Sequence, residues 1–400
     1  MIPPVELPSI SGRSFFRCAT EAAPFSTPPF IKLVNAFQTN KLPGRTVQTL
    51  EGNEYLWFSG TDYLGMAYNS DFQSFLREGF EHYGTHFGSS RNGSLRLAIY
   101  QEAEESFAAW QCSEAALLVS SGMLAGQLLI AQTDQIIRQL DNPGRILFHY
   151  APKVHPAIRG TGYYSNTLDW KTWAQLTVDQ INAGTPEMLH IICSDAVGSP
   201  MVEQFDFSVF DQIDSPDSCR LIIDQSHSLG VLGESGFGIA RQISQALLGR
   251  TTFVSSLNKA LGIPAGIIWG DRNVIDLLSQ SPLYAGASPS APVYISAFKR
   301  LLTNGNYTIT HANLLGNINY FAQQFQNSAD QFIRIPDYPV FCATDPALFD
   351  FLLKNGIMGS CFPYPLSTDV PVTRIAISAA HQKKDLDCLA EVCKRFKPLL

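Results

Sequence analysis

Short runs of apolar residues alternate with amphipathic segments along the middle of this chain, and this alternation most constrains its fold. The apolar runs cover residues 115–119, 145–148, 189–193, 220–223, 252–254 and 266–269. Helical periodicity lies between several of them, over residues 123–132, 170–182 and 239–248. Short apolar strands that alternate with helices are typical of a mostly parallel sheet with helices on both faces. We therefore predict an α/β fold with a mostly parallel central sheet.

The two ends of the chain differ from this middle region. Near the start we expect a strand over residues 54–58 and helices over residues 71–82 and 98–110. Beyond residue 290 the pattern indicates helices over residues 291–302, 310–327 and 384–396, with short strands near Val340 and over residues 374–378. We predict an N-terminal arm over residues 1–50 that carries a helical patch at residues 31–37. A large domain over residues 51–289 and a smaller α+β C-terminal domain over residues 290–400 follow.

Composition excludes several classes of function. The net charge is −7 and no long Lys/Arg-rich block is present, which argues against nucleic-acid binding. No apolar window is long enough for a transmembrane helix, and the N-terminus lacks the pattern of a signal peptide. The eight cysteines are scattered, without a CxxC motif, and neither they nor the histidines have metal-ligand spacing. We expect a cytoplasmic protein with no metal site.

Polar residues follow the apolar runs at the points where the predicted strands end. Asp224 and His227 follow residues 220–223, Ser199 follows residues 189–193, and His155 follows residues 145–148. Lys259 follows residues 252–254, and Ser121-Gly122-Met123 opens the helix after residues 115–119. Ligands of an open parallel sheet bind beyond the carboxyl ends of its strands. These side chains are therefore expected to meet at one edge of the sheet.

Each of these residues has an ordinary structural explanation when it is taken alone. Lys259 could be a surface lysine, Asp224 a helix cap, His227 a core histidine, and His155 a cap or a solvent-facing side chain. Together they match the needs of pyridoxal phosphate (PLP), because a desolvated lysine amine can form a Schiff base with its aldehyde.

The remaining needs of the cofactor match neighbouring residues. Asp224 could keep the pyridine nitrogen protonated, His155 could stack on the ring, and His227 could donate to the phenolic oxygen. The backbone of Gly122 and Met123, at a helix N-terminus, could bind the phosphate.

Seven segments, in this order along residues 58–387, resemble the α-oxoamine synthases of PLP fold type I. They are FSGTDYLGM (58–66), GSSRNGSLRL (88–97), SSGMLAG (120–126), HPAIRG (155–160), DQSHSLGVLGESGFG (224–238), SSLNKALG (255–262) and TRIAISAAHQKKDLD (373–387). The resemblance covers most of the chain, and the segments that hold Asp224 and Lys259 are the most specific. It implies a PLP-dependent transferase fold of type I.

The resemblance also implies roles for individual residues. Lys259 corresponds to the Schiff-base lysine, Asp224 to the partner of the pyridinium, His227 to the residue at the phenolic oxygen, and His155 to the stacking histidine. Gly122, Met123 and Ser256 fall where the phosphate is held. Ser288 corresponds to a hydroxyl given to the neighbouring subunit's phosphate, which implies a homodimer with shared active sites. Arg374 corresponds to the arginine that binds the amino-acid carboxylate, although a local carboxylate could also pair with it.

Three positions depart from the family pattern. Thr61 stands where an asparagine near the substrate is usual, Gln225-Ser226 replaces Glu-Ala, and Tyr100 replaces a histidine. The identity of the substrate is therefore left open by Thr61 in particular.

The implied reaction condenses an amino acid with an acyl thioester, of coenzyme A or an acyl carrier protein, and releases carbon dioxide to give an α-amino ketone. A PLP-dependent aminotransferase or decarboxylase is the alternative, since the same lysine and aspartate serve those reactions. A PLP-fold protein that acts only as a binding or scaffold module is a second alternative.

Overall fold

The computed structural model describes residues 36–141, 143–185, 187–325, 332–343, 345, 347–363 and 369–397. Residues 1–35 of the expected arm, with most of its helical patch, lie outside the described residues. The chain divides into two compact units, Met1–Ala36 and Phe37–Leu400, and every element below lies in the second unit. A boundary between a large and a small domain near residue 289 stays a prediction.

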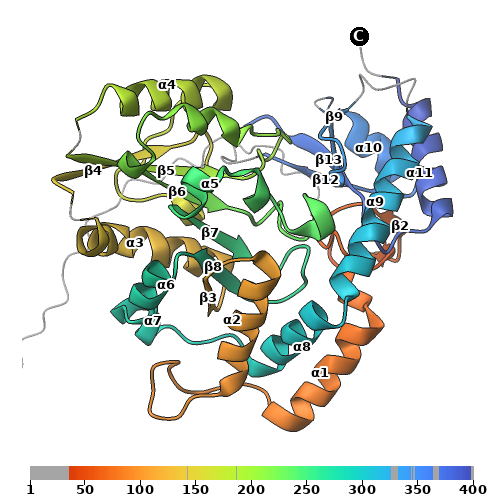
Figure 1. Cartoon of the computed structure of the whole chain (residues 1–400). Helices are drawn as coiled ribbons and strands as arrows, with labels where there is room; N and C mark the ends of the chain where they lie inside the picture. Colours follow the sequence, from red (N-terminus) through yellow and green to blue (C-terminus); the bar gives the residue numbers. More distant parts are fainter. Residues whose placement is uncertain are drawn as a thin grey trace, which may run out of the picture. The chain divides into compact units, whose positions relative to one another are not determined.

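A mostly parallel sheet forms the centre of the second unit (Figure 1). Within the described residues it has six strands, in the order β3-β8-β7-β6-β5-β4. These are β3 (Ala115–Val119), β4 (Arg145–Tyr150), β5 (Met188–Asp195), β6 (Cys219–Asp224), β7 (Thr251–Ser256) and β8 (Gly266–Gly270). The pairs β4–β5, β5–β6 and β6–β7 are parallel, and β8 runs antiparallel to both of its neighbours. The predicted fold class is confirmed.

Helices pack on this sheet and shield the apolar faces of its strands from solvent. The helix α3 (Gly122–Leu140) packs on β7 and β8, and α6 (Arg272–Ser279) packs on β3 and β8. The helix α8 (Pro292–Thr303) lies beside both α1 (Ser70–Tyr83) and α2 (Ala98–Gln111) (Figure 1). The other helices of this region are α4 (Trp170–Asn182), α5 (Gln245–Leu248) and α7 (Pro282–Gly286).

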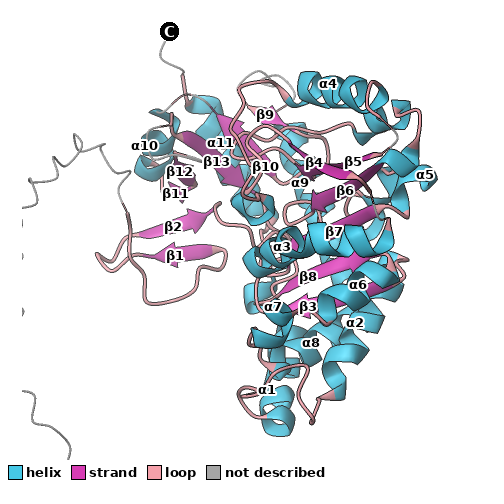
Figure 2. Cartoon of the chain, turned by 90° about the vertical axis from the view of Figure 1, so that its left-hand side faces the viewer, coloured by secondary structure: helices cyan, strands magenta, loops and turns pink. Residues whose placement is uncertain are grey.

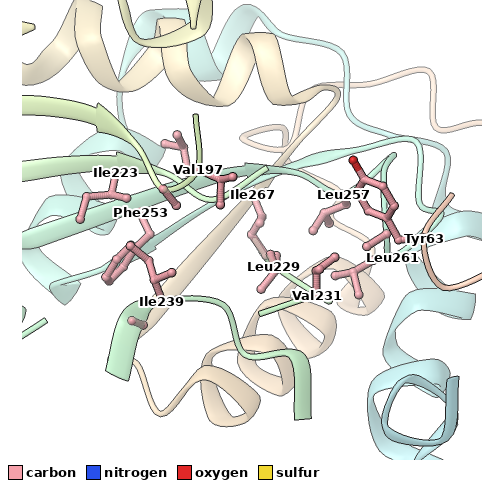
Figure 3. Close-up of a cluster of buried hydrophobic side chains, with 14 of the residues drawn as sticks. Tyr63, Val197, Ile223, Leu229, Val231, Ile239, Phe253, Leu257, Leu261 and Ile267 are labelled. Carbon is pink, nitrogen blue, oxygen red and sulfur yellow. The ribbon is translucent and has the colours of Figure 1, made fainter. Parts of the chain in front are cut away.

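Buried apolar side chains support the carboxyl ends of the central strands. The cluster includes Ile223 of β6, Phe253 of β7 and Ile267 of β8, each at most 2% exposed (Figure 3). Leu257 and Leu261, from the turn after β7, belong to the same cluster. Because closely packed apolar side chains resist displacement, they hold the starting points of the loops that follow these strands in place.

Smaller sheets bring the two ends of the described chain together (Figure 2). One contains β1 (Thr46–Gln48), β2 (Glu54–Trp57) and β11 (Ile357–Met358), and β2 pairs in parallel with β11. The other has the order β12-β13-β10-β9, with β9 (Ile333–Arg334), β10 (Val340–Ala343), β12 (Ser360–Phe362) and β13 (Val372–Ala376). The helices of this region are α9 (Asn306–Gln324), α10 (Ala347–Lys354) and α11 (Lys383–Arg395).

One predicted helix is wrong. Over residues 239–248 the structure has a 3-10 turn, Ala240–Gln242, and the four-residue helix α5. Ile243 and Ser244 between them have extended backbone angles, so a continuous helix cannot form. Ser244 occupies the N-cap position of α5 but makes no side-chain capping bond there. None of the helices in the described part of the chain is long and apolar enough to cross a membrane.

Candidate active site

Lys259 lies in a tight turn between β7 and β8. Hydrogen bonds from Leu257 N to Ala265 O (2.9 Å) and from Ile263 N to Leu257 O (2.9 Å) close this turn. Burial lowers the pKa of the Lys259 ammonium, although the nearby carboxylates of Asp224 and Asp195 oppose the shift. A lysine whose pKa is lowered has a larger fraction of neutral, nucleophilic amine. The turn therefore presents an amine suited to attack on a carbonyl.

Asp224 is the last residue of β6 and is 6% exposed. Its Oδ1 accepts a hydrogen bond from Ser226 N at 2.8 Å, which resembles the local capping role considered for it. That contact leaves Oδ2 without a bond in the described structure. Asp224 also acts electrostatically on both Lys259 and His155. Its carboxylate therefore both caps the local turn and contributes charge to the site.

His155 follows β4 and precedes a short 3-10 helix, Pro156–Ile158. Its Nδ1 accepts a hydrogen bond from Ala157 N at 3.1 Å, and its backbone N–H donates to Asp195 Oδ2 at 2.9 Å. Burial lowers the pKa of the His155 imidazole, and the Asp224 carboxylate opposes this shift. An acceptor Nδ1 in a neutral ring puts the proton on Nε2. The capping contact thus fixes both the tautomer and the ring plane.

His227 lies in the turn after β6. Burial holds the pKa of its imidazole well below the usual range, and the positive charges of Lys259 and Arg374 add to this effect. The hydroxyl of Tyr63 lies 3.5 Å from His227 Nδ1, at the long limit of a hydrogen bond. A neutral His227 can donate through one ring nitrogen.

A narrow cradle forms where the N-terminus of α3 meets the end of β7. A Cβ atom on Gly122 would lie 2.4 Å from Ser256 Cβ and 2.7 Å from Ser256 Cα, so only glycine fits there. Ser121 caps the helix by accepting a bond from Leu124 N at 3.1 Å. Within the described residues, the N–H groups of Gly122 and Met123 have no recorded acceptor. Free N–H groups at a helix N-terminus form an anion site.

Arg374, in the middle of β13, is 8% exposed. None of the ion pairs among the described residues includes it, so the local carboxylate partner considered for it is not found there. Its positive charge acts on Lys259, His227 and Tyr63. A buried guanidinium without a carboxylate partner is costly. The site can therefore accept a carboxylate ligand at this position.

Three predicted residues are not joined to this group. In the described part of the chain, no hydrogen bond or ion pair links Thr61, Ser199 or Ser288 to the residues above. Thr61 precedes the Asp62 turn, Ser199 lies in the loop after β5, and Ser288 is exposed. Met123 is also exposed, at 48%. The roles of these four side chains stay predictions, as do those of the residues above.

The sequence prediction gave no site role to three residues that the structure adds to the site. Asp195, the last residue of β5, is paired in register with Asp224. Ser226 accepts a hydrogen bond from Ser256 N at 2.7 Å, and Tyr63 lies beside His227. Asp195 could have been found, because it is a carboxylate at a strand end. Tyr63 comes from a distant part of the chain, and no local pattern indicates its position.

Comparison with known proteins adds relatives and structural neighbours. No family model matches the chain. The 8-amino-7-oxononanoate synthase of Aromatoleum aromaticum is 24% identical over 365 residues, which cover 87% of this chain and 90% of the relative. A structure of serine palmitoyltransferase with PLP as an internal aldimine has a TM-score of 0.74 at 15% identity and covers 89% of this chain and 91% of its own. The 8-amino-7-oxononanoate synthase of Francisella tularensis has a TM-score of 0.65 at 20% identity, with 85% and 97% covered.

These neighbours define the fold as the PLP-dependent transferase fold of type I, as the sequence motifs predicted. The curated relatives confirm the resemblance to the α-oxoamine synthases. The chain is similar to these enzymes in sequence, at 24% identity, and in fold.

Proposed function

We propose that this protein is a PLP-dependent acyltransferase that condenses an amino acid with an acyl thioester and releases carbon dioxide to give an α-amino ketone. Its homology to 8-amino-7-oxononanoate synthases supports acyl condensation as the class of reaction. The arrangement of Lys259, Asp224 and Arg374 supports the same class, because that chemistry needs a reactive amine, a carboxylate and a cation.

The residues of the site fit pyridoxal phosphate. The Gly122 cradle offers two free N–H groups to a phosphate, and a Cβ atom at this position would fill the space. Asp224 has one carboxylate oxygen available for a protonated ring nitrogen. Lys259 provides the amine for the aldehyde. When bound, the cofactor supplies an electron sink for a carbanion.

Each residue of the site has a separate role in the proposed reaction. Lys259 can take the α-proton of the substrate, because burial favours its neutral form. When the cofactor is bound, neutral His227 would donate a hydrogen bond to its phenolic oxygen, and His155, fixed by its bond to Ala157 N, would stack on its ring. Arg374 binds the amino-acid carboxylate through its planar fork.

The observation that carries the proposal is that a desolvated lysine lies in one electrostatic cluster with Asp224 and with a buried arginine that forms no ion pair with a described residue. The lysine alone would serve many PLP reactions. Arg374 adds the requirement that the substrate has a carboxylate, and the homology to α-oxoamine synthases selects the condensation among amino-acid reactions.

Replacement of Lys259 by Ala tests the proposal. We expect the purified wild-type protein to have a visible absorption band from lysine-bound PLP, and we expect Lys259→Ala to lose both this band and thiol release from an acyl thioester. Lys171→Ala, on the exposed face of α4, is the matched control and should keep both. A Lys259→Ala protein with full activity would contradict the proposal.

The same assay separates the alternatives. An aminotransferase or decarboxylase would have the absorption band and respond to amino acids, but would release no thiol from an acyl thioester. A scaffold protein would have no such band, and no amino acid would change its spectrum. Spectral titration with glycine, alanine and serine would identify the amino acid, for which Thr61 is a candidate determinant.

We further propose a homodimer with shared active sites, to which Ser288 contributes a hydroxyl at the neighbouring subunit's phosphate site. The exposure of Ser288 in the single chain is compatible with that role. Ser199 is proposed to lie at the cofactor ring. Cytoplasmic location stays a prediction from the cysteine pattern.

A further inference from the structure

Two carboxylates, Asp195 and Asp224, end neighbouring strands of the central sheet. Their Cα atoms are register partners in the parallel pair β5–β6. Register partners point to the same face of a sheet, and neighbouring strands lie about 4.8 Å apart. Both carboxyl groups therefore lie on one side of the sheet, next to each other and close to Lys259.

Each carboxyl group has one oxygen bound to a backbone N–H group. Asp195 Oδ2 accepts from His155 N at 2.9 Å, and Asp224 Oδ1 accepts from Ser226 N at 2.8 Å. Neither residue belongs to an ion pair among the described residues. Two adjacent carboxylates in a desolvated site cannot both be ionised without a strong cation between them.

The surrounding charges decide which of the two keeps the proton. Lys259 interacts electrostatically with both carboxyl groups, and more strongly with Asp224 than with Asp195. His155, in the loop after β4, interacts electrostatically with Asp224. The positive charge of Arg159, at the end of the same loop, acts on Asp195 more weakly than the negative charge of Asp224 does. Burial, and then the charge of Asp224, raise the pKa of the Asp195 carboxyl well above its usual range.

We propose that Asp195 is a positioning residue that carries a proton in the resting protein, so that the pair holds a single negative charge on Asp224. The inference rests on the proposed function, because Asp224 is the group expected to bind the ring nitrogen of the cofactor. An ionised Asp195 would add a second buried charge next to Asp224, and a protonated Asp195 leaves one carboxylate for the ring nitrogen.

The first test uses the protein without cofactor. A carboxyl group that stays protonated in the folded state and ionises in the unfolded chain makes stability fall as pH rises above about 4. The Asp195→Asn variant cannot ionise, so its thermal midpoint should exceed the wild-type midpoint at pH 8 and converge with it at about pH 4. The matched control is Asp276→Asn, on the exposed face of α6. Its thermal midpoint should differ from the wild-type midpoint by the same amount at pH 4 and at pH 8. Parallel curves for wild type and Asp195→Asn would overturn the inference.

The second test measures PLP binding by absorbance. The Asn side chain mimics a protonated carboxyl group, so Asp195→Asn should bind PLP within about threefold of wild type at pH 7. Asp224→Asn, which loses the ionised partner, should bind at least about tenfold more weakly. If Asp195→Asn weakens binding as much as Asp224→Asn does, Asp195 is ionised and the inference fails.

The two tests separate this inference from the proposed function. If wild type binds no PLP, the proposed function fails while the stability curves still decide the state of Asp195. Should Asp195→Asn not fold, Asp195→Ser replaces it, because serine can also accept from His155 N and cannot ionise.

Discussion

Replacement of Arg374 by Met should weaken amino-acid binding and leave the free protein at least as stable. Arg374 is 8% exposed, and no ion pair among the described residues includes it. A forked, charge-assisted pair with a substrate carboxylate contributes about 1.5–3 kcal/mol. At about 1.4 kcal/mol per tenfold change, Arg374→Met should raise the Kd for the amino acid about 10- to 150-fold.

Stability should move the other way, because the substitution removes a buried charge that no carboxylate of the described residues neutralises. We expect the free energy of unfolding of Arg374→Met to be unchanged or higher by up to about 3 kcal/mol. Spectral titration gives the Kd, and urea unfolding without ligand gives the stability. Arg374→Lys should recover only part of the affinity, because an ammonium lacks the planar fork.

Arg91 is the matched control for this reasoning. It forms a two-bond ion pair with buried Glu104, with both N–O distances at 3.0 Å. Arg91→Met would remove the ion-pair partner of buried Glu104, at a cost of about 3–5 kcal/mol. If Arg374→Met loses as much stability as Arg91→Met and keeps its affinity for amino acids, Arg374 is a structural residue and the reasoning is refuted.

Two further predictions concern the cofactor cradle and the pH dependence of stability. Gly122→Ala should abolish PLP binding measured by absorbance, because its Cβ would lie 2.4 Å from Ser256 Cβ, whereas Gly162→Ala, with nothing within 4 Å, should bind normally. His149 Nε2 lies 2.8 Å from His190 Nδ1, and burial lowers the pKa of His149 to about 4. As the pH falls, His149 is therefore protonated in the unfolded chain before it is protonated in the folded protein. The free energy of unfolding should consequently fall by roughly 2.5 kcal/mol between pH 7.5 and 4.5. His149→Asn should reduce that fall in urea unfolding, and an unchanged slope would contradict the assignment.

Much of the fold could be predicted because its strands and helices differ clearly in apolar pattern. The run at residues 115–119 and the helix at residues 170–182 match β3 and α4 to the residue, since each is bounded by polar or capping residues. Residues 239–248 were mispredicted because apolar residues in a buried irregular loop can imitate helical periodicity. The antiparallel direction of β8 also follows from tertiary pairing and not from local sequence.

The site likewise contains residues that could be predicted from the sequence and residues that could not. The positions of Lys259, Asp224, His227 and His155 could be predicted, because each lies at or after the end of a recognisable strand. Partners that come from remote segments could not be assigned from the sequence. The Tyr63 hydroxyl reaches His227 across 164 positions of the chain, and no sequence spacing indicates such a contact.

The backbone bonds between residues 58–63 and residues 376–379 have a consequence for how this protein is made. Backbone bonds from Ala376 N to Phe58 O and from Ala379 N to Tyr63 O, both 2.8 Å, hold the strand of Arg374 against the early part of the chain. During synthesis, the segment around Phe58 emerges long before its partners exist. The carboxylate-binding end of the site can therefore form only after synthesis has passed Ala379, and contacts of such long sequence separation fold slowly.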